Sequence, residues 1–273
     1  MPVYQAIILG IIQGLTEFLP VSSSAHLNLF PWLLGWNQMP ASFDVALHIG
    51  TLLAIVIFFF KDWVKLIVGG YNQVVKKKKT TEGKIFWYLV IATIPAGILS
   101  VLLSKVSEKL FEKSLNVEMI VIAITLIVMG IILYIVDKKA KSKTKYENIT
   151  LKQSVAIGTS QALAAAFPGV SRSGITMTVA RALGIDRESA AKYSFLLATP
   201  ITVAAVIFDM KNFDFSSLAF WLGILFSFIV GILIIKFLLD YLKKGSFKVF
   251  AIYRIIVGIA VILTALIRWL IWQ

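Results

Sequence analysis

Six long apolar segments dominate this sequence and restrict the folds that it can adopt. Each approaches the roughly 20 residues that a helix needs to cross the hydrocarbon core of a bilayer. The segments are residues 43–60, 85–103, 117–136, 189–208, 217–236 and 249–271. Hydrophobic residues make up 59% of the chain, above the roughly 45–50% typical of soluble domains. We therefore predict an all-α integral membrane protein with six transmembrane helices.

The charges between these segments predict their orientation. Lysines concentrate in 61–84, 137–152 and 236–248, which hold seven, six and four of them against two, two and one acidic residues. Segments 104–118 and 209–216 carry no excess of lysine. The positive-inside rule places the lysine-rich segments in the cytoplasm. The net charge of +13 then reflects topology and anionic lipid headgroups, and no nucleic-acid partner is expected. There is no cysteine, which excludes disulfides and thiolate metal sites.

Two further segments, 4–36 and 152–185, are apolar but interrupted by polar residues and proline. The predicted orientation requires each of them to return to the side that it entered, so we predict two re-entrant helical hairpins. Their sequences match at an offset of 148 residues, and the match resumes one residue later after Gly169. The matching pairs are Gly10 and Gly158, Gln13 and Gln161, Leu15 and Leu163, Pro20 and Pro168, Val21 and Val170, Ser22 and Ser171, and Ser24 and Ser173.

This match predicts one membrane domain over residues 1–273, built as an inverted-topology repeat. The first repeat is 1–140 and the second is 150–273, each with one hairpin and three spans. An odd number of spans inverts the second copy, and such repeats bind ligands near the bilayer midplane, at the interface between the copies.

The first hairpin carries a carboxylate, hydroxyls and an imidazole. Gln13 and Glu17 lie four residues apart, on one face of a helix that Pro20 ends. Ser22 and Ser23 are good N-cap residues for a second helix, and His26 follows one turn later. A helix that begins there directs free N–H groups toward the break, which favours an anion.

The second hairpin carries a cation in place of the carboxylate. Ser171, Arg172 and Ser173 begin a helix after the Pro168–Gly169 break, and Thr176 lies one turn after Arg172. The planar guanidinium of arginine suits phosphate. Each residue alone has a structural explanation, since serines serve helix packing and ion pairs serve stability. Together they favour one anion site between the hairpins, in which Glu17 binds a metal or acts as a base.

Two more ionisable residues, His48 and Arg254, receive no definite role from the sequence. His48 begins a span and is explained as a helix cap. Arg254 is explained either as a structural counter-ion, for example for an acidic group, or by a position near the membrane interface.

These motifs resemble those of the bacterial undecaprenyl-pyrophosphate phosphatase family, known for bacitracin resistance. The family's (E/Q)xxxE element is similar to Gln13–Glu17, followed by FLPVSS and a histidine at 18–26, and its PGxSRSxxT element is similar to 168–176. The resemblance covers nearly the whole chain. It implies hydrolysis of undecaprenyl pyrophosphate to undecaprenyl phosphate, which recycles a carrier lipid for peptidoglycan synthesis and confers bacitracin resistance. It also implies a divalent cation, magnesium or calcium, and a site on the outer side of the bacterial cytoplasmic membrane. Gln13 is the neutral option in the first motif, which leaves Glu17 as its one carboxylate.

A mechanism for this reaction uses the same residues. Arg172, Ser171, Ser173 and Thr176 hold phosphoryl oxygens, with Gln13 and Ser22 as polar neighbours. Glu17 binds the metal or orients the attacking group. Ser23 is the preferred nucleophile with His26 as its proton partner. In the alternative, His26 attacks directly or activates water. The other expected partners are membrane lipids, and a second copy of the chain in a homodimer is a further candidate.

Two other classes of protein, a transporter and a structural scaffold, are weighed against this function. Inverted repeats with broken helices are a transporter design, so a lipid-phosphate flippase or a small-anion transporter fits the same pattern. A structural scaffold does not explain an acid, an imidazole and an arginine at matching breaks.

Overall fold

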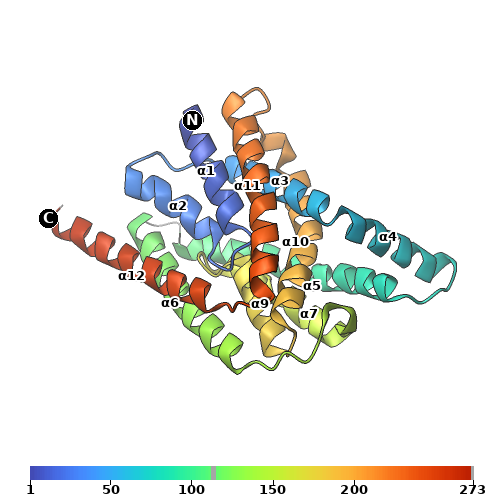
Figure 1. Cartoon of the computed structure of the whole chain (residues 1–273). Helices are drawn as coiled ribbons and strands as arrows, with labels where there is room; N and C mark the ends of the chain where they lie inside the picture. Colours follow the sequence, from blue (N-terminus) through green and yellow to red (C-terminus); the bar gives the residue numbers. More distant parts are fainter. Residues whose placement is uncertain (112–114, 272–273) are drawn as a thin grey trace.

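The computed structural model describes residues 1–111 and 115–271, and these residues are mostly helical (Figure 1). The first helices are α1 (Val3–Thr16), α2 (Ser23–Leu34), α3 (Ala41–Phe58), α4 (Phe60–Val75), α5 (Thr81–Phe111) and α6 (Leu115–Lys139). After the 3₁₀ turn η1 (Tyr146–Asn148) follow α7 (Leu151–Ser160), α8 (Ala162–Ala166), α9 (Arg172–Ala182) and α10 (Arg187–Asp209). The chain continues through a second 3₁₀ turn, η2 (Met210–Asn212), into α11 (Leu218–Leu242) and α12 (Lys248–Ile271).

The six predicted spans are confirmed as long apolar helices. In the part of the chain that the structure describes, six helices are long and apolar enough to cross a membrane. They are Ala41–Phe58, Thr81–Lys105, Val117–Lys139, Arg187–Asn212, Leu218–Leu242 and Lys248–Leu270. Large apolar side chains such as Phe208, Leu233 and Ile256 are exposed on these helices. A continuous apolar exterior of this kind marks a surface that contacts lipid.

The lysine-rich segment 61–84, predicted as a connection, contains the helix α4. It packs along the start of α5, and Gly70 makes the close approach possible. A Cβ atom on Gly70 would lie 2.3 Å from the ring of Phe86, and Trp87 Nε1 donates a hydrogen bond to the Gly70 carbonyl (3.2 Å). The segment was predicted as a connection because its lysines are typical of an exposed loop. α5 also continues to Phe111, beyond the predicted end at 103, and residues 112–114 of the predicted connection 104–118 lie outside the described residues.

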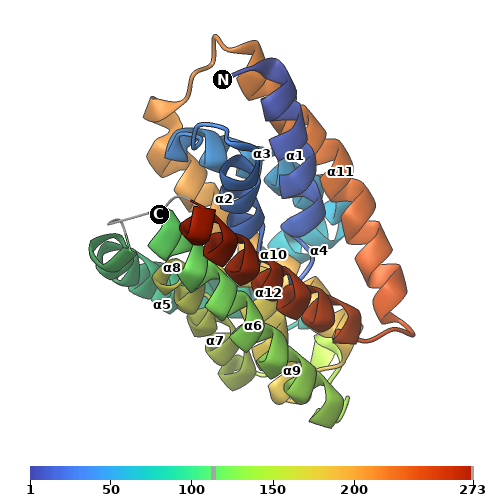
Figure 2. The same cartoon turned by 90° about the vertical axis from the view of Figure 1, so that its left-hand side faces the viewer.

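Small residues bring the long helices into close contact. α11 packs against both α1 and α3, and α6 lies beside α12 (Figure 2). A Cβ atom on Gly10 would lie 2.5 Å from the Gly223 carbonyl oxygen, and one on Gly50 would lie 2.4 Å from that of Ile224. In a bilayer such contacts replace the hydrophobic effect as the source of helix association, because lipid tails are as apolar as the side chains.

The two proline-interrupted segments break in the same way. α1 ends and α2 begins after Ser22, while α8 ends and α9 begins after Ser171. Ser22 (φ 77°) and Ser171 (φ 71°) have the positive φ that is uncommon outside glycine, and each side chain caps the next helix by accepting the backbone N–H three residues on. Strained residues of this kind cluster at functional sites.

Arg254 of α12 holds both breaks together. Its Nη1 donates to the Pro20 carbonyl (3.1 Å), and its Nη2 donates to the carbonyls of Gly169 (2.8 Å) and Val170 (3.1 Å). Its side chain is 1% exposed and its Nε lies 3.4 Å from the Leu126 carbonyl. The arginine therefore pairs with backbone carbonyls of the two turns, whereas the sequence suggested a counter-ion for an acidic group.

Candidate active site

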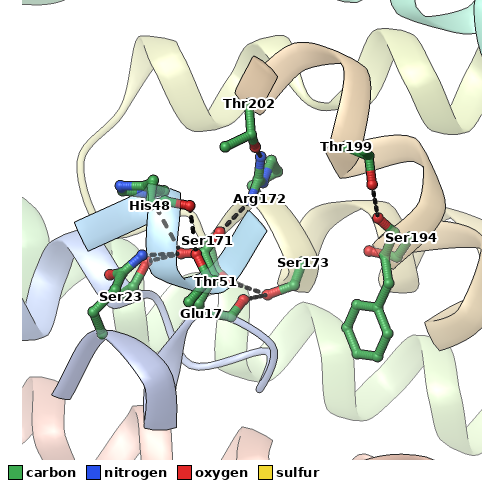
Figure 3. Close-up of polar contacts among 12 residues, drawn as sticks. Glu17, Ser23, His48, Thr51, Ser171, Arg172, Ser173, Ser194, Thr199 and Thr202 are labelled. Carbon is green, nitrogen blue, oxygen red and sulfur yellow. Dashed lines mark hydrogen bonds and ion pairs between the residues drawn. The ribbon is translucent and has the colours of Figure 1, made fainter. Parts of the chain in front are cut away.

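Glu17 is the centre of a buried polar cluster at the end of α1. It is 6% exposed, and its Oε1 forms an ion pair with Arg172 Nη2 at the start of α9 (Figure 3). Its Oε2 accepts hydrogen bonds from Ser23 Oγ (2.6 Å) and Gln13 Nε2 (3.0 Å). A buried carboxylate requires this degree of compensation, because removing it from water costs several kcal/mol. The two breaks thus bring Glu17, Ser23 and Arg172 together, as the sequence predicts.

Arg172 bridges two helices across this cluster. One guanidinium nitrogen contacts Glu17, and Nη1 donates to Thr202 Oγ1 of α10 (2.6 Å). The side chain retains 22% exposure, so the guanidinium is oriented by both partners and still accessible from one side. A planar cation held in this way is suited to bidentate recognition of phosphate.

A cavity of about 300 Å³ opens beside the cluster. Its polar lining comprises Glu17, Ser23, Asp44, His48, Gln161 and Arg172, together with the Ser24, Ser100, Ser171 and Thr202 hydroxyl residues. This volume lies at the lower end of ligand pockets, which span roughly 300–1,000 Å³. It suits a polar headgroup better than a complete lipid, whose tail would remain outside.

The start of α3 adds a second carboxylate and an imidazole to the cavity. His48 Nδ1 contacts the Asp44 carbonyl oxygen (2.9 Å), and since a carbonyl only accepts, Nδ1 carries the proton. His48 Nε2 lies 3.5 Å from Glu17 Oε2, and Nδ1 lies 3.7 Å from Asp44 Oδ1. The imidazole therefore lies between the two carboxylates, a role that the sequence did not assign to it.

These side chains fit a divalent cation that is shared with a substrate. No group of three or more His, Cys, Asp or Glu residues suited to a metal occurs within 1–111 and 115–271. Asp44 Oδ1 is buried, and no described residue donates a hydrogen bond to it. Magnesium commonly takes one or two carboxylates and completes its shell with substrate phosphate oxygens and water. Glu17 and Asp44 both line the cavity, and they are residues of the type that such a shared site uses.

Three predicted substrate-binding hydroxyls serve the local structure instead of lining the cavity. Ser22 caps α2 and contacts Ser24 Oγ (3.3 Å). Ser173 Oγ donates to the carbonyls of Glu17 (3.0 Å) and Leu19 (3.1 Å), which ties α9 to the first break. Thr176 Oγ1 contacts the Arg172 carbonyl (2.9 Å) and the Ser194 hydroxyl. They hold the breaks in position, and among the predicted hydroxyls Ser23 and Ser171 line the cavity.

The contacts of the His26 ring are with residues other than Ser23, the residue that it was predicted to assist. Its Nδ1 contacts the Ser22 carbonyl (2.7 Å) and its Nε2 contacts the Tyr253 hydroxyl (2.8 Å). It lines a different cavity of about 220 Å³ with Tyr253 and apolar residues of α2 and α12. Both ring nitrogens are therefore engaged away from the Glu17 cluster.

Sequence reasoning missed several residues that line the cavity, among them Asp44, Gln161 and Thr202. Asp44 precedes His48 by one helical turn, so the i, i+4 spacing on an otherwise apolar span was a readable signal. Gln161 was visible as the match of Gln13 in the second segment. Thr202 gave no signal, because a single threonine in a span is common.

The fold and the cavity define a polytopic helical membrane protein with a polar cavity that contains a buried carboxylate–arginine ion pair. Residues 6–260 match the family described as bacitracin resistance protein BacA, and the chain belongs to this family. It is 48% identical to an undecaprenyl-diphosphatase of Pelotomaculum thermopropionicum, with 98% of each chain covered. It is 45% identical to proteins of the same name from Caldicellulosiruptor bescii (98% and 99% covered) and Desulforudis audaxviator (97% and 98% covered).

Proposed function

We propose that this chain hydrolyses undecaprenyl diphosphate to undecaprenyl phosphate and inorganic phosphate. The observation that carries the proposal is the Ser23 hydroxyl, which lies 2.6 Å from a carboxylate whose other oxygen pairs with Arg172. A hydroxyl beside a base and a phosphate-binding cation is the arrangement that phosphoryl transfer requires. The similar chains named undecaprenyl-diphosphatase supply the substrate.

Ser23 is the nucleophile in this proposal and Glu17 is its general base. Glu17 Oε2 takes the Ser23 proton while Oγ bonds to the terminal phosphorus, and the bridging P–O bond breaks to release undecaprenyl phosphate. Water then attacks the phosphorus of the phosphoserine and the P–Oγ bond breaks. Glu17 returns its proton to Ser23 Oγ, and inorganic phosphate leaves with both protons of the water. The engaged nitrogens of His26 favour this route over attack by the imidazole.

Substrate binding would itself activate Glu17. In the ligand-free cavity the carboxylate is neutralised by Arg172, which makes it a weak base. A diphosphate competes for the guanidinium of Arg172, and weakening of the ion pair with Arg172 raises the basicity of Glu17.

A divalent cation, magnesium or calcium, is part of the proposal. Glu17 and Asp44 would hold it at the cavity wall, and the cation would neutralise charge on the diphosphate when bound. The buried Asp44 Oδ1, which has no hydrogen-bond partner among the described residues, supports this assignment.

We further infer that segments 4–36 and 152–185 are re-entrant hairpins of an inverted repeat. Two observations support this: Ser22 and Ser171 share an uncommon backbone conformation, and the helix pairings correspond. α1 packs on α11 as α7 and α8 pack on α5, and the equivalent spans α6 and α12 pack on each other.

The cavity would face the outer side of the cytoplasmic membrane. It is lined by Asp44 near the start of α3, Ser100 near the end of the span in α5, and Thr202 in the second half of the span in α10. By the positive-inside rule, the lysine-rich connections would place these helix ends away from the cytoplasm.

Single-turnover release of inorganic phosphate from undecaprenyl diphosphate in detergent tests the function. Wild type should release one phosphate per substrate, and Ser23→Ala should release almost none while remaining folded. A lipid flippase or an anion transporter, the alternative on the same scaffold, would release none in either case. Absence of release by wild type, with the cation supplied, would refute the enzymatic proposal.

A further inference from the structure

Gln161 is a buried polar residue with no partner in the described part of the chain. It lies at the junction of α7 and α8 and is 3% exposed. Neither its Nε2 nor its Oε1 has a hydrogen-bond partner among the described residues, yet the residue lines the cavity that contains Glu17 and Arg172. Buried amides nearly always have partners, because an unpaired donor and acceptor cost folding free energy. Retention of such a group beside a cavity points to a ligand.

The matching residue in the first segment shows what Gln161 lacks. Gln13 Nε2 donates to Glu17 Oε2, four residues further along α1. The residue four positions after Gln161 is Ala165, which has no carboxylate and also lines the cavity. The N–H donors of Gln161 are therefore not consumed within the protein, and the small side chain of Ala165 leaves space beside them.

The cavity consequently presents two kinds of polar group. Glu17 and Asp44 present carboxylates, whereas Gln161 and Arg172 present N–H donors. The segment that carries Gln161 and Arg172, 152–185, contributes no carboxylate to the cavity lining. Carboxylates favour a cation, and amide and guanidinium donors favour phosphoryl oxygens.

The geometry points to Gln161 as a phosphate-binding residue, whose Nε2 donates to a phosphoryl oxygen of the diphosphate while Arg172 holds another. This inference rests on the proposed function, since it assigns a further contact to the same substrate. It requires no covalent step, because the amide only binds and orients the group that is transferred.

Replacing the amide with an apolar side chain of similar length separates binding from structure. Gln161→Met should weaken the affinity for inorganic pyrophosphate and raise KM for undecaprenyl diphosphate by about tenfold, with a smaller change in kcat. Its melting temperature in detergent should be unchanged or higher, because an unpaired buried amide is lost. Gln161→Glu should weaken pyrophosphate binding further, since it sets a carboxylate against the phosphate.

Ser160→Ala is the matched control, because Ser160 Oγ donates to the Ile157 carbonyl of its own helix (2.6 Å) and should leave both constants unchanged. Pyrophosphate binding is measured by its thermal shift, independently of turnover. The inference is overturned if Gln161→Met keeps wild-type pyrophosphate affinity, or if it melts earlier or fails to fold, which would show an amide that serves the structure. If wild type binds pyrophosphate but hydrolyses nothing, the proposed function fails while this binding role stands.

Discussion

Replacing Arg172 with lysine tests whether a forked cation is needed in the cavity. The guanidinium contacts Glu17 through Nη2 and Thr202 through Nη1, on two different helices. A lysine keeps the charge but has a single nitrogen, so it reaches one of these positions and loses the second charged hydrogen bond. Such a bond contributes about 1.5–3 kcal/mol, which corresponds to a loss of roughly 10- to 150-fold in kcat/KM.

The assay is phosphate release at several substrate concentrations, with melting temperature as the measure of folding. The retained charge should keep the lysine variant folded. A double-mutant cycle with Thr202→Val isolates the second contact: Thr202→Val should cost less in the lysine background than in wild type. A lysine variant within about twofold of wild-type kcat/KM, or equal costs of Thr202→Val in both backgrounds, would refute the reasoning.

Three further substitutions test other parts of the site. Asp44→Asn should lower the apparent affinity for magnesium or calcium by roughly tenfold, as measured by a thermal-shift titration. An unchanged titration would remove Asp44 from the cation site. His26→Ala should lower phosphate release by less than about tenfold, because the imidazole contacts Tyr253 and not Ser23; a loss of about 10²–10⁴-fold would restore His26 as the base. Arg254→Ala leaves at least two buried carbonyls unpaired, at a cost of about 1–3 kcal/mol each, so the melting temperature should fall by many degrees. Equal melting temperatures of wild type and variant would contradict the role of Arg254 in holding the two breaks together.

The spans and the motif residues were predictable because their signals are local. Hydropathy over about 20 residues identifies a span. The spacing of Gln13 and Glu17, and the run after Pro168, identify two helix breaks that carry complementary charges. The pairing of Glu17 with Arg172 followed from charge, since an isolated ion inside a membrane is costly.

The contacts that decide the role of each residue were not predictable, because they join distant parts of the chain. His26 was assigned to Ser23 from proximity in sequence, yet its ring contacts Tyr253, 227 residues further on. Thr202 reaches Arg172 from α10, whose sequence did not indicate that it contacts the second break. α4 was missed for a different reason, since its lysines resemble those of an exposed connection while its glycines pack closely on α5.

The position of Arg254 has a consequence for the biogenesis of the protein. The guanidinium that ties the Pro20 and Gly169 turns comes from α12, which is synthesised 234 and 85 residues after those turns. A nascent chain that has inserted every earlier helix still lacks this tie. Completion of the cavity is therefore delayed until at least residue 254 has left the ribosome and entered the bilayer, so unfinished chains would be inactive at the membrane.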